Sequence, residues 1–166
     1  EQKSKQAGRT VFRRLSYCSY YILNRHKYCG TIEQMNEDMW NAFKSTAYIN
    51  VKKLPGTSSS ENLAIQSASK ENKQILLDQI KLFKPNIIIG CNTLRYFSKD
   101  FEFNMNNKKF LSYPWLRKDQ GYYPQKEELY IDICHPAYRF KKITDEAFIQ
   151  AVMICVNDWI NNYRGK

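Results

Sequence analysis

Three short apolar runs, each closed by polar or small residues, dominate the hydrophobic pattern of the chain. They cover residues 46–51, 86–91 and 129–134 and are rich in β-branched and aromatic side chains. Runs of this length and composition predict buried β-strands. Helical stretches of about a dozen residues or more lie between or after the runs, which favours parallel strands in one sheet. The pattern therefore predicts a single α/β domain over residues 1–166 with a central, mostly parallel sheet.

Helical periodicity of the apolar residues predicts the elements around these strands. Residues 1–8 are polar and are expected to be frayed. Residues 101–125 are irregular, with two prolines and three asparagines, and are expected to form a long loop that contains at most one short strand, at 109–113. The expected helices are 10–24, 31–43, 61–83, 93–100 and 144–163.

Charge and aromatic content favour a nucleic-acid partner. Lys and Arg outnumber Asp and Glu by 26 to 16, which gives a net charge of +10, and twelve Tyr accompany nine Phe and three Trp. Basic and aromatic side chains together suit a surface that holds phosphates and stacks bases. The alternative is a lysine-rich protein that binds no nucleic acid, and net charge alone does not separate the two.

The cysteines and histidines argue against disulfides and metal sites. Five Cys are irregularly spaced without a CxxC pair, and the chain has only two His. Neither a disulfide framework nor a zinc site is expected, and no other cofactor is indicated. The sequence has no signal peptide and no apolar run of the ~20 residues that cross a membrane. We therefore expect a cytoplasmic protein with no membrane partner.

Three polar residues at the ends of the predicted strands are candidates for function. Asn50 ends the first strand, Asn92 follows the second and His135 follows the third. In an open α/β sheet, ligands bind outside the carboxyl ends of the strands. We therefore expect these three side chains to gather at one edge of the sheet.

His135 and Asn50 have the chemistry that recognition of a base requires. Pro136 forces the chain to turn after His135, whose imidazole titrates near neutrality and suits acid–base or electrostatic work. The Asn50 amide offers a donor and an acceptor, so it can read the edge of a base. The alternatives are that His135 caps the strand and that Asn50 satisfies its own backbone in a turn. Tyr138 and Arg139 follow at once and suit a nucleic-acid surface.

A loop with two lysines and several hydroxyls follows the first predicted strand. Its side chains are suited to hold a phosphodiester together with backbone amides. The alternative is a solvated loop in which Ser60 caps the next helix. The GxxxxGK[ST] order of a Walker phosphate loop is absent. The loop residues proposed for DNA contact are Lys52, Lys53, Thr57, Ser58 and Ser59.

Two further features carry weaker signals. Cys91 follows an apolar run, and nothing in the sequence gives its thiol the low pKa and exposure that reactivity needs. Arg9, Arg13 and Arg14 cluster near the start of the first predicted helix, where they oppose the helix dipole. We therefore expect an acidic neighbour or a bound anion beside these arginines.

The order of these features resembles the uracil-DNA glycosylase superfamily, in particular a divergent bacterial branch. The resemblance spans roughly residues 40–160 and rests on the strand that ends at Asn50, the Ile-Ile-Ile-Gly run at 87–90 and the strand that ends in His135-Pro136. It implies a three-layer α/β/α sandwich with a central, mostly parallel sheet. It also implies an enzyme that binds DNA and cleaves the N-glycosidic bond of uracil or another modified base flipped from the stack.

The resemblance assigns roles to individual residues. Asn50 would read the base, and His135 would stabilise the base as it departs with negative charge. Residues 137–140 would enter the duplex. Tyr48 is suited to stack on the base, although packing in the core is the alternative for this side chain.

The chain departs from the family pattern in two places. The first family motif, a strand followed by a loop with the water-activating Asp or Asn, is not visible. Either the chain lacks this motif or the motif lies upstream of Glu1, and we expect the second. HPAY at 135–138 replaces the HPS motif. Three hypotheses therefore stay open: an active glycosylase, an inactive nucleic-acid-binding module of the same fold, and an unrelated α/β enzyme that binds a nucleotide or phosphate ester through the loop at 52–60.

Overall fold

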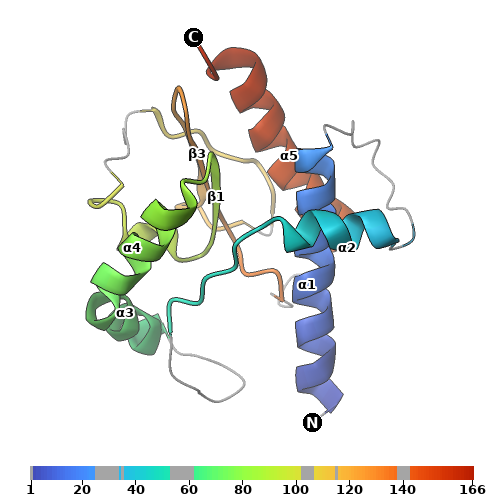
Figure 1. The fold of residues 1–166 in the computed structure, drawn as a ribbon, viewed down its shortest axis with the longest axis horizontal. Coiled ribbons are helices and arrows are strands. Elements are labelled where there is room, and N and C mark those ends of the chain that lie inside the picture. The colour runs from blue at the N-terminus through green and yellow to red at the C-terminus, as the bar shows by residue number, and fades with distance from the viewer. Residues whose placement is uncertain are drawn as a thin grey trace.

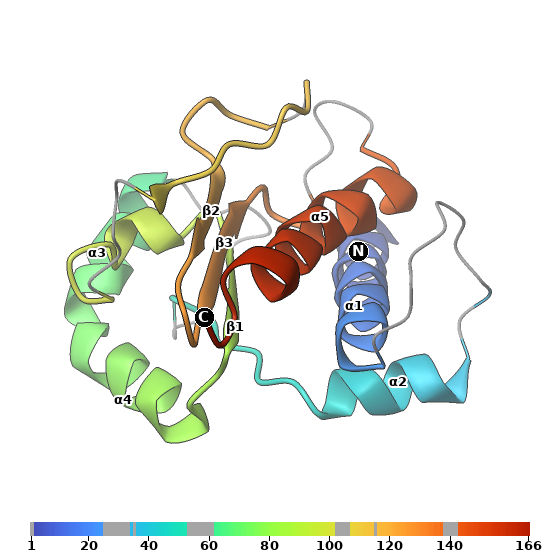
Figure 2. The same ribbon diagram turned by 90° about the horizontal axis from the view of Figure 1, so that it is seen from above.

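Helices lie on both sides of a small sheet (Figures 1 and 2). The computed structural model describes residues 2–24, 34, 36–52, 62–101, 107–114, 116–137 and 143–166. The class is α/β, and no described helix has both the length and the apolar character needed to cross a membrane. The elements are α1 (Gln2–Leu23), α2 (Glu37–Lys44), α3 (Asn62–Glu71), α4 (Lys73–Phe83), β1 (Ile87–Cys91), the 3-10 helix η1 (Leu94–Tyr96), β2 (Gly121–Pro124), β3 (Leu129–Ile133) and α5 (Asp145–Asn162).

The described sheet is mixed and has the strand order β1-β3-β2. β1 and β3 run parallel, and β2 pairs antiparallel with the other side of β3. Asp132 of the central strand lies opposite Gly90 of β1 and Gly121 of β2. Because β2 is antiparallel, its first residue lies at the same edge of the sheet as the carboxyl ends of β1 and β3.

The main core fills the face of the sheet that α1 and α5 cover (Figure 2). Every second residue of β3 points to this face, namely Leu129, Ile131 and Ile133, and all three are fully buried. The other face carries a smaller cluster in which Tyr130 of β3 packs with Leu94 of η1. The central strand is thus buried on both faces, which explains its continuous apolar sequence.

Two of the three predicted strands are confirmed. The runs at 86–91 and 129–134 form β1 and β3. The strand predicted at 46–51 is wrong, because residues 46–50 have no regular secondary structure. Ala47, Tyr48 and Asn50 are exposed there, so this run lacks the burial that stabilises a strand of this composition.

One strand of the structure was not predicted from the sequence. The prediction assigned residues 121–124 to a long loop, but they form the fully buried β2. Its four residues are Gly-Tyr-Tyr-Pro, so residues that usually break strands stand at both ends. The short strand predicted at 109–113 is reduced to a single bridge between Lys109 and Tyr122.

Four helix predictions need correction of their limits. α1 begins at Gln2, so the expectation that 1–8 are frayed is wrong for the described backbone. The helix predicted at 61–83 is divided at Asn72 into α3 and α4. The helix expected at 93–100 is one turn of 3-10 helix, η1. In the segment 31–43, the described helix is α2, which begins after the N-cap Asn36.

The last predicted helix, 144–163, is confirmed as α5. Thr144 is its N-cap, and the Thr144 hydroxyl oxygen accepts a hydrogen bond from the backbone N of Ala147 at 3.1 Å. Asp145 and Glu146 in the first turn complement the helix dipole.

Candidate functional site

The carboxyl ends of β1 and β3 are joined by a backbone hydrogen bond. The backbone N of Asn92, the first residue after β1, donates to the carbonyl oxygen of Ile133, the last residue of β3, at 2.7 Å. Asn92 has a φ of 64°, in the left-handed region that Asn tolerates better than most residues. The turn after β1 therefore begins beside the end of β3, and it lies close to His135.

His135 is exposed, and its ring is oriented by the turn that Pro136 imposes. The backbone N of Ala137 donates a hydrogen bond to Nδ1 of His135 at 3.2 Å. Desolvation by the surrounding protein lowers the pKa of the imidazole from its ordinary value. The neutral ring therefore accepts at Nδ1 and carries its proton on Nε2. This arrangement caps the turn, as the alternative interpretation of His135 predicts, and within the described residues only Nδ1 of the ring has a hydrogen-bond partner.

The segment 46–52 passes the carboxyl end of β1 on its way from α2 to α3 (Figures 1 and 2). Tyr48 is half-exposed, and its ring lies 6.1 Å from that of Phe12 on α1, at an interplanar angle of 55°. Burial raises the pKa of the Tyr48 hydroxyl, and the thiol of Cys91 at the end of β1 raises it further. Tyr48 therefore lies within electrostatic reach of Cys91, the last residue of β1.

The other predicted DNA-contact residues are mostly beyond what the structure describes. Asn50 is exposed and Lys52 is half-buried, both on the segment that passes β1. The predicted residues outside the described part of the chain are Lys53, Thr57, Ser58, Ser59, Tyr138 and Arg139.

Arg14 fixes the chain on both sides of the segment that follows His135. Its guanidinium donates to the carbonyl oxygens of Pro136 and Ile143, each at 2.5 Å. Its Nε donates to Asp145 at 2.7 Å, and Arg13 forms a second ion pair with the same carboxylate at 2.6 Å. The acidic neighbour expected beside these arginines is therefore Asp145.

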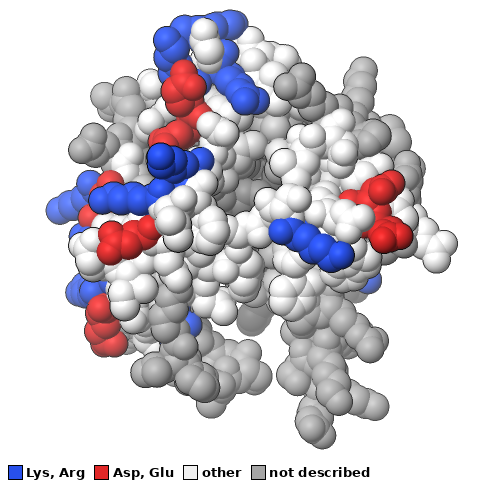
Figure 3. Space-filling model, viewed as in Figure 1, with Lys and Arg blue, Asp and Glu red and all other residues white. Residues whose placement is uncertain are grey.

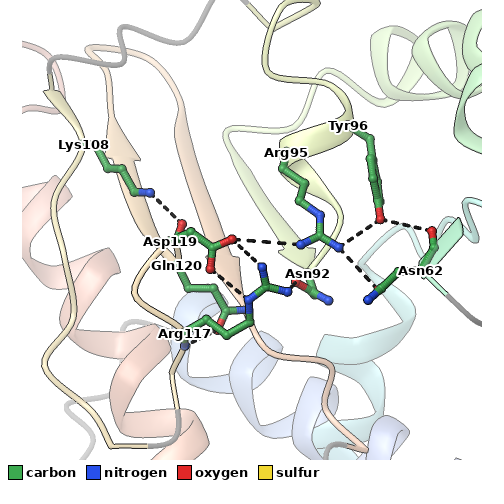
Figure 4. Close-up of polar contacts among 8 residues, drawn as sticks. All are labelled: Asn62, Asn92, Arg95, Tyr96, Lys108, Arg117, Asp119 and Gln120. Carbon is green, nitrogen blue, oxygen red and sulfur yellow. Dashed lines mark hydrogen bonds and ion pairs between the residues drawn. The ribbon is translucent and has the colours of Figure 1, made fainter. Parts of the chain in front are cut away.

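A second polar group lies at the same edge of the sheet, before β2 (Figure 4). Arg117 holds the Asp119 carboxylate with both arms of its guanidinium, Nε to Oδ1 at 2.9 Å and Nη2 to Oδ2 at 2.6 Å. Nη1 of Arg95 lies 4.0 Å from Oδ2 of Asp119. We call Arg95, Arg117 and Asp119 the arginine cluster.

The arginine cluster is attached to the surrounding elements by further hydrogen bonds. Nη1 of Arg117 donates to Oδ1 of Asn92 at 3.3 Å, which connects it to the end of β1. Nζ of Lys108 donates to the backbone oxygen of Asp119 at 2.6 Å. Partial burial would raise the pKa of the Asp119 carboxyl, but the hydrogen bonds and charge of Arg117 outweigh burial and lower it.

Asp132 is a buried carboxyl in the central strand, on the face opposite α5. Burial raises its pKa to about 6, with a further contribution from the charge of Asp119. One carboxylate oxygen, Oδ1, accepts no hydrogen bond from the residues that the structure describes. The backbone N of Leu94 donates to the carboxylate, and the charge of Arg95 opposes the shift. A buried carboxyl group is costly to keep charged, so we expect the stability of the protein to depend on the protonation of Asp132.

The described residues offer neither a reactive thiol at the carboxyl ends of β1 and β3 nor a group of metal ligands. Burial raises the pKa of both Cys91 and Cys134 to about 12, so neither thiol ionises readily. Among the described residues, no three His, Cys, Asp or Glu side chains form a group that could hold a metal ion.

The net positive charge is not gathered into one continuous patch on the face seen in Figure 3. Lys and Arg side chains there alternate with Asp and Glu, mainly along one side, and the middle of this face is uncharged. Overall charge therefore does not locate a nucleic-acid site, and individual groups such as the arginine cluster must be judged by their contacts.

Comparison of the chain with protein-family models, with curated proteins and with solved structures gives no match. Any functional conclusion therefore rests on the residues and their geometry.

Proposed function

We propose that the protein binds DNA and cleaves the N-glycosidic bond of uracil or another modified base, as a divergent relative of the uracil-DNA glycosylases. In this proposal the parallel pair β1 and β3 belongs to the central sheet of a three-layer α/β/α sandwich. The flipped base would lie outside the carboxyl ends of these strands, between His135 and the segment that carries Tyr48 and Asn50.

The observation that carries the proposal is the hydrogen bond that orients His135, an exposed residue just after β3. The backbone N of Ala137 donates to Nδ1, so the neutral ring carries its proton on Nε2, and desolvation, which lowers the pKa of the imidazole, favours this neutral form. When the bond between C1′ and the base nitrogen breaks, the bonding electrons leave with the base. A hydrogen bond from Nε2 to a base oxygen would stabilise that negative charge, and water would supply the hydroxyl that C1′ receives.

Aromatic side chains beside this edge support the same proposal. Phe12 and Tyr48 are both partly exposed, and the ring of Phe12 also contacts Phe43 edge-on with centroids 5.7 Å apart. A group of this kind offers a face on which a base can stack. Asn50, exposed two residues beyond Tyr48, would read the edge of that base.

The test is a cleavage assay on single- and double-stranded oligonucleotides that contain uracil, with other modified bases in parallel. We expect abasic product, and a single-turnover rate about 10²- to 10³-fold lower in His135→Ala, the cost of removing one donor to a developing anion. Asn50→Ala should also lower the rate, whereas Asn41→Ala, which removes an exposed amide from α2, should not.

The pH profile separates a chemical role of His135 from a structural one. Protonation would place a hydrogen on Nδ1 and break the hydrogen bond from Ala137 that orients the ring. Because the pKa is lowered, the rate should fall through this loss of orientation only when the pH drops below the ordinary imidazole value of 6.5, and His135→Gln should abolish that fall. A protein that makes no abasic product on any tested base, yet binds DNA with a steep dependence on salt, would be the inactive binding module instead. A His135→Ala variant as fast as the wild type would refute the assigned role.

A further inference from the structure

The arginine cluster contains a carboxylate in the place where two guanidinium groups would hold an external anion. Arg117 grips Asp119 through two parallel hydrogen bonds, and Arg95 approaches the same oxygen from η1. Paired N–H donors of this kind match a phosphate as well as they match a carboxylate. Two positive charges share one negative charge here, so the cluster retains an excess of positive charge.

The pairing with Asp119 can be broken at little cost. The side chains of Arg117 and Asp119 are 47% and 53% exposed, and that of Arg95 is 29% exposed. Exposed ion pairs contribute little to stability because water and salt compensate for their loss, although the bidentate geometry makes this pair stronger than most. A competing anion therefore needs only a modest advantage to displace the Asp119 carboxylate.

Both guanidinium groups have other partners that keep them oriented when Asp119 moves away (Figure 4). Nη2 of Arg95 donates to the Tyr96 hydroxyl at 3.0 Å and to Oδ1 of Asn62 at 3.4 Å. Nη1 of Arg117 donates to Oδ1 of Asn92. Pre-oriented donors lose less conformational freedom on binding, which favours a ligand.

The turn that carries Asp119 is itself well fixed. The backbone N of Arg117 donates to Oε1 of Gln120 at 3.0 Å, and the backbone N of Gln120 donates to the carbonyl oxygen of Arg117 at 3.0 Å. Lys108 adds a third positive charge through its bond to the backbone oxygen of Asp119. The Asp119 side chain can thus rotate away without disturbing the backbone that holds Arg117 and Lys108.

From this geometry we infer that Arg95 and Arg117 bind a backbone phosphate of a nucleic-acid strand, and that Asp119 occupies this phosphate site until the strand displaces it. The inference rests on the proposed function for its partner, and it gives the strand a path from the edge near His135 toward η1, because Asn92 touches Arg117 and lies at the end of β1. Asp119 competes with the phosphate for the two guanidinium groups, so it lowers the affinity for every nucleic acid by the same factor.

The test uses a fluorescent single-stranded oligonucleotide of ordinary bases, so that binding is measured without cleavage. We expect Asp119→Asn to tighten binding roughly fivefold, because the amide keeps the shape of the side chain and removes the competing charge. Asp100→Asn is the matched control, since Asp100 forms an ion pair with Lys73 at 2.7 Å and the change in net charge is the same. It should alter affinity far less.

Removal of the arginines should act in the opposite direction. Arg117→Ala and Arg95→Ala should each weaken binding and reduce the slope of log affinity against log salt by about 1, as expected for one lost phosphate contact. Lys73→Ala should leave the slope nearly unchanged. In the Arg117→Ala background, Asp119→Asn should have a much smaller effect, because only the longer contact between Asp119 and Arg95 remains to be relieved.

Each outcome separates this inference from the proposed function. Equal effects of Asp119→Asn and Asp100→Asn would overturn the phosphate site, even if the wild type makes abasic product. Stronger binding by Asp119→Asn alone would support the site, even if no base is cleaved. Inorganic phosphate is the second probe: if it raises the melting temperature of Asp119→Asn while oligonucleotide affinity is the same in all variants, the site binds free phosphate and the nucleic-acid assignment is wrong.

Discussion

Arg14 and Asp145 form an ion pair between α1 and α5, with Nε of Arg14 2.7 Å from Oδ1 of Asp145. The Arg14 side chain is only 6% exposed, so its charge is almost completely removed from water. It also donates to the carbonyl oxygens of Pro136 and Ile143, which lie on either side of the segment after His135. One buried guanidinium therefore joins two helices to the turn that orients the candidate catalytic histidine.

Loss of the Arg14 side chain should be among the most damaging single changes in the protein. Arg14→Ala leaves two buried carbonyl oxygens without their donor and removes the more buried of the two arginines that pair with Asp145, and we expect the free energy of unfolding in urea to fall by about 3–5 kcal/mol. Arg13→Ala is the matched control, because Arg13 pairs with the same carboxylate but is 48% exposed. It should cost about 1 kcal/mol or less. Equal losses for the two variants would contradict the assignment.

Asp132 should make the stability of the protein depend on pH in an unusual direction. Its pKa is raised from 3.8 to about 6, so the folded protein binds this proton more tightly than the unfolded chain does. The stabilisation from the protonated form is complete below about pH 4 and is lost as the pH rises through 6, a loss of about 3 kcal/mol. Asp132→Asn should remove this dependence while its amide oxygen still accepts from the Leu94 backbone.

The measurement for Asp132 is the difference in unfolding free energy between wild type and Asp132→Asn at several pH values from 4 to 7. Asp158→Asn provides the opposite sign. Partial burial favours a higher pKa for Asp158, but hydrogen bonds from Lys109, Asn162 and Tyr122 outweigh it and lower the pKa. The contribution of Asp158 is therefore lost as the pH falls below the ordinary aspartate value of 3.8, so this control needs further points below pH 4. A constant difference for Asp132→Asn across this range would show that its pKa is not raised.

The sequence predicted the strands whose residues have the composition typical of a buried strand. Residues 129–133 are fully buried and mostly apolar, and residues 87–89 are three consecutive, partly buried Ile, so composition alone identified both strands. The strand expected at 46–51 has a similar composition but is exposed, which only the tertiary structure could reveal. β2 escaped prediction because its Gly and Pro ends are tolerated beside the edge of a sheet, where few ladder bonds are needed.

The sequence predicted which strand ends lie together, but it did not predict most of the polar groups found beside them. Parallel pairing of β1 and β3 puts Asn92 and His135 at one edge, and this follows from the order of strands and helices. The arginine cluster could not be predicted, because Arg117 meets Asn92 across 25 positions of sequence. Asp132 did leave a signal: a carboxylate inside an otherwise apolar strand is a buried polar group that needs an explanation.

Gly90 tests how closely η1 packs against the sheet. A Cβ at position 90 would lie 2.1 Å from Cγ of Leu94, which is buried, so neither atom can move freely. Gly90→Ala should therefore lower the free energy of unfolding by about 1–3 kcal/mol, as overpacking of a core does. The double variant with Leu94→Ala should be more stable than the sum of the two single changes predicts. Strict additivity in urea unfolding would show that the two positions do not contact each other.

The ring of Tyr48 is half-exposed and contacts Phe12 at the surface, so its replacement should affect DNA binding more than stability. If the ring stacks on a base, Tyr48→Ala should weaken binding of single-stranded DNA by about 1–3 kcal/mol, and Tyr48→Phe should leave it nearly unchanged. Phe83→Ala, which removes an exposed ring from α4, is the control for loss of aromatic surface. Similar weakening by Tyr48→Ala and Phe83→Ala, with melting temperatures equal to the wild type, would exclude Tyr48 as the stacking residue.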